Sequence, residues 1–143
     1  MGKSGWIDEP LYSKIRASIP IATVDLLVVY KHRLLLMLRN DEPAKNLWFT
    51  PGGRILLGES FEEAVRRVLE KETGLTPIKM EKKGVMSHVW SNHHNITIFY
   101  HIDVNNDNVK MNEEHEAYKW ISKVTNDLHP YIKEMIKEAK ILE

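Results

Sequence analysis

The 143-residue sequence has no cysteine, no excess of either charge and no long apolar run. Without cysteine, neither a disulfide framework nor a thiolate metal site can form. The 20 basic and 20 acidic residues balance, which disfavours a protein that binds nucleic acid or a membrane surface through a broad basic field. The apolar stretches LLVVY and LLLML are far too short to span a bilayer, and MGKSGWIDEP holds no apolar signal core. We therefore expect a cytoplasmic protein with one domain over residues 1–143.

The periodicity of apolar residues predicts several strands and three helices. β-branched and apolar runs predict strands at 19–30, 34–40, 47–53, 83–90, 95–104 and 116–122. Helical spacing predicts a short helix at 9–18, a longer one at 60–74 and a closing helix from about residue 126. One helix inserted among strands and one at the end predict an α/β fold, a three-layer α/β/α sandwich with a mixed sheet.

The helix after Ser60 is the clearest element in the sequence. Ser60 and Glu63 have the spacing of a capping box, and Gly74 is a natural helix terminator. Its predicted core-facing side carries Phe61, Ala64, Val65, Val68 and Leu69. Glu72 falls in the middle of that apolar side, where burying a carboxylate is costly unless it is paired or binds a metal. A helix that has already left the core at that turn would explain Glu72 equally well.

A motif spans this helix and the glycine-rich segment before it. The spacing G, five residues, E, seven residues, R-x-U-x-x-E-x-G-U, with U apolar, is met by Gly53, Glu59, Arg67, Leu69, Glu72, Gly74 and Leu75. This pattern resembles the box of the Nudix hydrolase family, which implies the sandwich fold predicted above. Two glutamates of the family box are replaced here by Val68 and Lys71.

The two replacements bear on the metal site that the resemblance implies. Ordinary Nudix pyrophosphohydrolases use these glutamates to hold two or three divalent ions, and a lysine ammonium repels a cation. The resemblance therefore implies one Mg²⁺, with Mn²⁺ as a substitute, held by Glu72 and a carbonyl oxygen of the glycine-rich loop.

Further stretches resemble one subfamily, the GDP-mannose mannosyl hydrolases, which also lack these two glutamates. The similar stretches are TVDLLV, LRNDEPAKNLWFTPGGR, GVMSH, IFYHI and EEHEAYKW, whereas WSNHHN is shorter than its counterpart. The resemblance implies water attack at the sugar C1 of a nucleotide sugar, GDP-mannose being our expectation, to give GDP and free sugar. It also implies a homodimer in which the N-terminal arm, residues 1–19, helps to build the interface, although this arm could equally pack on its own sheet.

The resemblance assigns roles to individual residues. The metal ligands are Gly52, Glu72 and Glu114. The catalytic group consists of His115 as general base and of Arg39 and Tyr100 at the leaving diphosphate. The substrate-binding residues are Asp25, Arg54, Arg67 and His88. Histidine has an ordinary pKa of about 6.5, which suits proton abstraction near neutral pH.

Several alternatives stay open on the sequence alone. Arg67 could bind Glu59 and fix the loop instead of touching substrate. His93 and His94 invite a metal interpretation, but no partner motif accompanies them and we expect an exposed turn there. An ordinary pyrophosphohydrolase attacking phosphorus, and a sugar-nucleotide sensor without catalysis, are the alternative functions.

Overall fold

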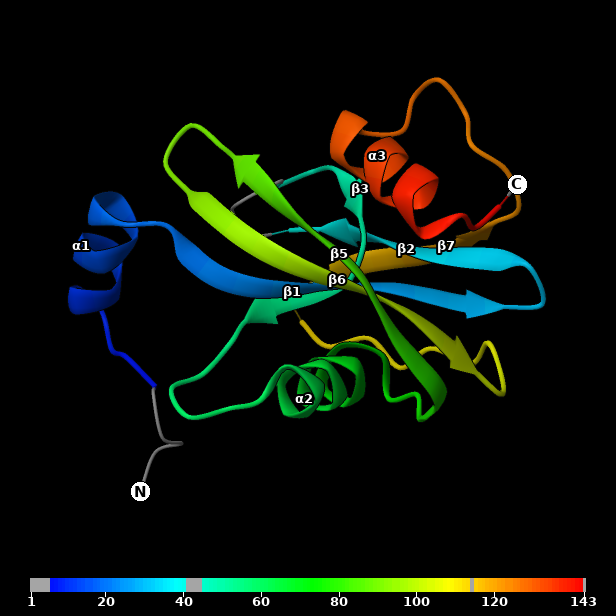
Figure 1. The fold of residues 1–143 in the computed structure, drawn as a ribbon, viewed down its shortest axis with the longest axis horizontal. Helices are drawn as coiled ribbons and strands as arrows, with labels where there is room; N and C mark the ends of the chain where they lie inside the picture. The colour runs from blue at the N-terminus through cyan, green and yellow to red at the C-terminus, as the bar shows by residue number, and fades with distance from the viewer. Residues whose placement is uncertain (1–5, 41–44, 114, 143) are drawn as a thin grey trace.

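The protein is described here from a computed structural model that covers residues 6–40, 45–113 and 115–142. A mixed sheet forms its centre, with α2 on one face and α3 on the other (Figure 1). The helices are α1 (Leu11–Ser18), α2 (Phe61–Thr73) and α3 (Pro130–Ala139). The strands are β1 (Ile21–Tyr30), β2 (Arg33–Arg39), β3 (Trp48–Phe49), β4 (Gly52–Arg54), β5 (Pro77–Val89), β6 (His94–Val104) and β7 (His115–Ile121). The predicted α/β/α sandwich is confirmed.

The strand order β3-β2-β1-β6-β5 places β1 in the middle of the sheet. β1 and β2 form an antiparallel hairpin whose two turn residues, Lys31 and His32, have φ angles of 49° and 61°. β1 runs parallel to β6, while β4 pairs with β1 and β7 pairs with β2, both antiparallel. Because side chains alternate along β1, Leu26 packs in the core under α2 and Leu27 in the core under α3.

The helix α2 begins and ends where the sequence predicts. The Ser60 hydroxyl accepts from the Glu63 N–H, the Glu63 carboxylate accepts from the Ser60 N–H, and Gly74 adopts a left-handed conformation at the C-terminus. Four predicted core residues, Ala64, Val65, Val68 and Leu69, are buried. The prediction is wrong for Phe61, which is 42% exposed because the first turn leaves the core, and the Lys82 ammonium lies 5.6 Å from the centre of its ring.

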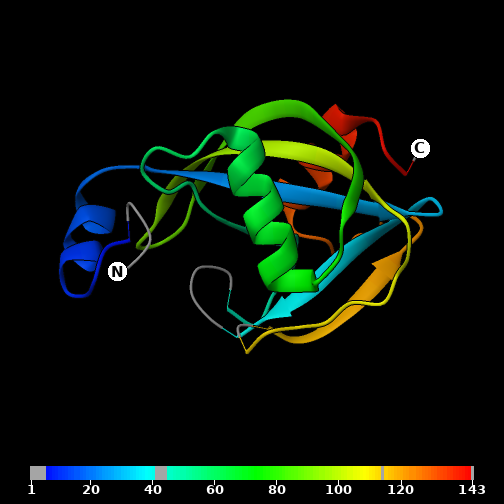
Figure 2. The same cartoon turned by 90° about the horizontal axis from the view of Figure 1, so that it is seen from below.

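The helix α1 stands at the start of β1, apart from α2 and α3 in both views (Figures 1 and 2). It contains no buried residue, and the apolar side chains of its first residue, Leu11, and of Ile19, just after its end, are each 56% exposed. The apolar side expected for this helix is therefore not covered by the sheet in the described structure. A contact between two copies through the arm stays a prediction. No helix in the described ranges is both long enough and apolar enough to cross a membrane.

Candidate active site

A cavity of about 660 Å³ lies where α1, β1, β4 and α2 approach the ends of β2 and β5. Its wall brings together candidate residues that lie far apart in the sequence. They are Asp25, Arg39, Gly52, Arg54, Arg67, Glu72 and His88. Of the other candidates, His115 and Tyr100 do not line this cavity, and Glu114 lies outside the described residues.

Glu72 lies on the cavity wall in the last turn of α2. It is 3% exposed, so the carboxylate expected in the middle of the apolar helix face is indeed buried. The Oε1 atom of Glu72 lies 3.6 Å from Nε2 of His115, at the start of β7. The His115 side chain has no exposed area, so it lies behind Glu72 as seen from the cavity.

The family that the sequence resembles uses divalent cations. The oxygen and nitrogen donors of this cavity therefore decide whether it can hold such an ion. No group of three or more His, Asp or Glu side chains in the described ranges is arranged to hold a metal ion. Glu72 offers one buried carboxylate beside the Gly52 segment, and both line the same cavity. Such a donor set fits one hard cation that completes its coordination shell with ligand oxygens and water. The carboxylates of the described residues do not form a site that holds several ions.

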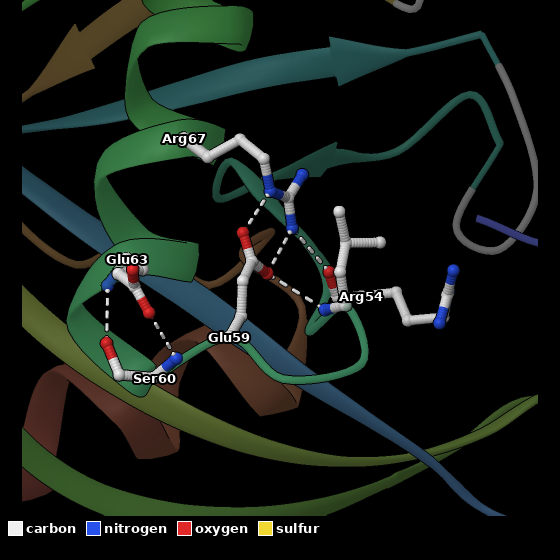
Figure 3. A network of polar contacts seen from close by, with 6 residues as sticks. Arg54, Glu59, Ser60, Glu63 and Arg67 are labelled. Atoms are coloured by element: carbon white, nitrogen blue, oxygen red, sulfur yellow. Dashed lines mark hydrogen bonds and ion pairs between the residues drawn. The ribbon is translucent and has the colours of Figure 1, made fainter. Parts of the chain in front are cut away.

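The loop before α2 is fixed by Arg67 (Figure 3). The Arg67 Nε donates to Glu59 Oε2 at 2.6 Å, and its Nη2 donates to Glu59 Oε1 at 3.0 Å and to the Arg54 carbonyl at 2.7 Å. Glu59 Oε1 also accepts from the Leu56 N–H at 2.8 Å. A two-point arginine–carboxylate pair of this kind holds its partners in one orientation. The structure thus gives Arg67 the loop-fixing contact that the sequence left as one of two alternatives.

Asp25 on β1 lies in a cluster of buried polar side chains. Its carboxylate accepts from the Thr97 hydroxyl at 2.7 Å and from the Thr50 hydroxyl at 3.1 Å, and His88 Nδ1 lies 3.7 Å away. Burial raises the pKa of the Asp25 carboxyl, while His88 and the two hydroxyls act in the opposite direction. Burial lowers the pKa of His88, against the pull of the Asp25 charge.

The position of Asp25 depends on the lack of a side chain at Gly52. A Cβ atom at Gly52 would lie 2.8 Å from Asp25 Oδ1 and 2.8 Å from the Val24 carbonyl oxygen. The His88 ring stacks on the ring of Tyr131 in α3, with ring centres 4.2 Å apart. Among the described residues, no hydrogen-bond partner reaches the buried His88 Nε2 atom. Asp25 and His88 thus form a buried polar corner of the cavity.

Tyr100 lies in a different environment from the other candidates. It is buried in the core beneath α2, together with Leu26 and Ile98. Burial raises the pKa of its hydroxyl, and the charge of Glu62 adds to the effect. Its place in the core separates it from the cavity wall.

The sequence did not predict two parts of the cavity wall. Two guanidinium groups lie near the ring of Tyr12 in α1, with the Cζ atoms of Arg16 and Arg54 each 5.5 Å from its centre. All three residues line the cavity, and no sequence spacing connects position 12 with position 54. The turn expected at His93 is present between β5 and β6, but the expected exposure is wrong, because His93 is 8% exposed and lines the cavity together with Trp90.

A family model described as NUDIX domain matches residues 20–138, so the chain belongs to the NUDIX domain family. The mixed sheet, the fixed loop before α2 and the cavity at Glu72 agree with this class, and we identify the protein as a Nudix hydrolase.

Three similar proteins illustrate the range of the family. The low-salt glycan biosynthesis protein Agl8 of Haloferax volcanii is 27% identical over 134 residues, covering 88% of this chain and 86% of that protein. An ADP-ribose pyrophosphatase of Methanocaldococcus jannaschii is 38% identical over 68 residues, covering 48% of this chain and 40% of its own length. The crystal structure of a MutT protein from Methanosarcina mazei Go1 has a TM-score of 0.76 at 26% identity, covering 86% of this chain and 95% of that one.

Proposed function

We propose that this protein hydrolyses a nucleotide sugar to a nucleoside diphosphate and free sugar by water attack at the sugar C1. The substrate that we propose is GDP-mannose, which would give GDP and mannose. The observation that carries the proposal is the cavity-facing side of α2, where the buried Glu72 lies next to Lys71. The Glu72 carboxylate beside the Lys71 ammonium suits the binding of a departing diphosphate. It is less suited to holding the several metal ions that attack at phosphorus uses.

Attack at carbon makes two demands on the protein. Water must lose a proton, and the charge of the leaving diphosphate must be neutralised. Arg39 and Arg54 lie on the cavity wall and are the residues that we assign to the diphosphate. Glu72 and the Gly52 carbonyl would hold one Mg²⁺, with Mn²⁺ as a substitute, and the ion supplies Lewis-acid stabilisation of the leaving group when bound. We also retain Glu114 as a proposed ligand.

The buried corner of the cavity suits the sugar. Asp25 and His88 can form hydrogen bonds with the hydroxyl groups of a sugar. A ligand that supplies hydrogen bonds to buried polar groups removes the free-energy cost of leaving them without partners. In this arrangement the sugar points toward Asp25 and the diphosphate toward α2. We assign Arg67 to the loop and give the core residue Tyr100 no contact with the substrate.

His115 is our proposed general base. It adjoins Glu72, and water bound near that carboxylate would therefore be close to the imidazole. Because the His115 side chain is covered, this role requires the start of β7 to move when substrate binds. Attack from the side opposite the diphosphate inverts C1 and yields β-mannose from the α-linked substrate.

The second candidate is a pyrophosphohydrolase that attacks phosphorus. The partial similarity to an ADP-ribose pyrophosphatase favours it, whereas the glycan-related name of the relative from Haloferax volcanii favours a sugar-containing substrate. Homodimer formation through the N-terminal arm, residues 1–19, belongs to the proposal and does not discriminate between the two reactions.

Product identification separates the two candidates. The protein is incubated with GDP-mannose and Mg²⁺, and the products are resolved by chromatography. We expect GDP and mannose. The appearance of GMP and mannose 1-phosphate would instead establish attack at phosphorus, and ADP-ribose as a parallel substrate tests the preference for the nucleotide.

A further inference from the structure

Lys71 replaces a glutamate of the family box and lies on the wall of the cavity. It is in the last turn of α2, four residues after Arg67 and one before Glu72, so these three side chains approach the cavity from the same helix. Lys71 is exposed, whereas Glu72 is buried. The helix therefore places an exposed lysine side chain beside a buried carboxylate.

Arg67 is the other basic residue of α2 on the cavity wall. Both Arg67 nitrogens described above bind Glu59 or the Arg54 carbonyl, so its guanidinium is committed to the loop. Lys71 lies one helical turn further along, and its flexible stem lets the ammonium follow an anion in the cavity. Lys71 therefore adds a second positive charge of α2 to the cavity wall, and its exposed side chain can reach a ligand phosphate.

We propose that the Lys71 ammonium binds the diphosphate of the substrate directly and supplies, as a fixed charge, neutralisation that multi-metal relatives obtain from a further divalent ion. The inference rests on the proposed function in one respect, namely that a nucleoside diphosphate group occupies this cavity. It has a distinct consequence: the protein binds GDP with Lys71-dependent affinity when no divalent cation is present.

The test measures GDP binding by isothermal titration calorimetry in excess EDTA. The variants are Lys71→Gln, which removes the charge, and Lys71→Arg, which keeps it. Arg66→Gln is the matched control, because Arg66 lies on the same helix, is exposed and is absent from the cavity wall. Thermal melting of each variant shows whether it remains folded.

We expect Lys71→Gln to weaken metal-free GDP binding about 10- to 100-fold, the span of a charge-assisted hydrogen bond. Lys71→Arg should stay within a few-fold of the wild type, and Arg66→Gln within about two-fold, because an exposed distant charge is screened. Equal binding by Lys71→Gln and wild type would overturn the inference. An equal loss in Arg66→Gln would overturn it as well, since bulk charge would then explain the effect.

The outcomes for the inference and for the proposed function differ. If the wild type binds GDP only with Mg²⁺, the inference fails and the proposed reaction stands. If binding depends on Lys71 but the products of GDP-mannose are GMP and mannose 1-phosphate, the inference stands and the reaction at C1 fails. If the wild type binds no GDP even with Mg²⁺, both fail.

Discussion

His115 Nε2 and Glu72 Oε1 lie 3.6 Å apart at the cavity wall, joining the start of β7 to the last turn of α2. The pair brings the proposed base next to the proposed metal ligand, although 42 residues separate them along the chain. The two residues therefore make separable predictions, one about the cation and one about the proton.

Replacing Glu72 by Gln should remove the cation while keeping the fold. A neutral amide is a poor ligand for Mg²⁺, so turnover should fall on the order of 100-fold or more. The melting temperature should stay equal or rise, because a buried charge is removed. Steady-state kinetics and Mn²⁺ titration followed by electron paramagnetic resonance measure the two effects. Glu70→Gln, an exposed change on the same helix, serves as control. Undiminished turnover in Glu72→Gln would refute the assignment of the ligand.

Replacing His115 by Gln should change the pH dependence of the reaction. In the wild type the rate should rise with pH as His115 loses its proton, and in the variant this rise should flatten. Turnover should also fall on the order of 10²–10⁴-fold, the usual contribution of a general base. The pH profile of kcat at saturating Mg²⁺ measures both. If the variant is slower but retains the rise with pH, His115 only positions Glu72.

Gly52 is predicted to be essential for the fold around Asp25. In Gly52→Ala the new Cβ would lie 2.8 Å from both Asp25 Oδ1 and the Val24 carbonyl oxygen, and β1 cannot move easily in the centre of the sheet. We expect the free energy of unfolding to fall by about 1–3 kcal/mol. Denaturant titration measures the change. Gly53→Ala is the control, because its Cβ would meet only a Val68 methyl group at 3.2 Å and should cost less. Equal stability of Gly52→Ala and wild type would contradict the close packing described here.

The buried imidazole of His88 should make stability sensitive to acid. Burial lowers the pKa of His88 in the folded protein below its ordinary value of 6.5, so the unfolded chain binds the proton more readily. Stabilisation of the folded state is therefore complete above pH 6.5 and is lost as the pH falls below this value. His88→Asn should show a smaller drop of melting temperature on acidification than the wild type. His32→Asn, in the exposed β1–β2 turn, should leave the drop unchanged. An identical pH dependence in His88→Asn and wild type would contradict this explanation.

Local signals made α2 predictable from the sequence. The capping box, the terminal glycine and the apolar spacing act within one helix, and they also placed Glu72 in the buried face. Phe61 departs from the pattern because periodicity does not show where the sheet beneath a helix ends.

The positions of Tyr100 and His115 relative to the cavity could not be predicted from the sequence and became visible only in the three-dimensional structure. The run ITIFYHI is apolar at nearly every position, so period-two alternation does not reveal which face of β6 each side chain joins. The approach of Tyr12 to Arg54 likewise depends on where the chain enters β1. Such relationships arise from packing between distant segments.

Hydrolysis of GDP-mannose in oxygen-18 water tests the central claim most directly. The label should appear at C1 of the released mannose, as measured by mass spectrometry, and the released GDP should be unlabelled. Oxygen-18 in a phosphate group of the nucleotide or of a sugar phosphate would contradict the account, because water would then have attacked phosphorus.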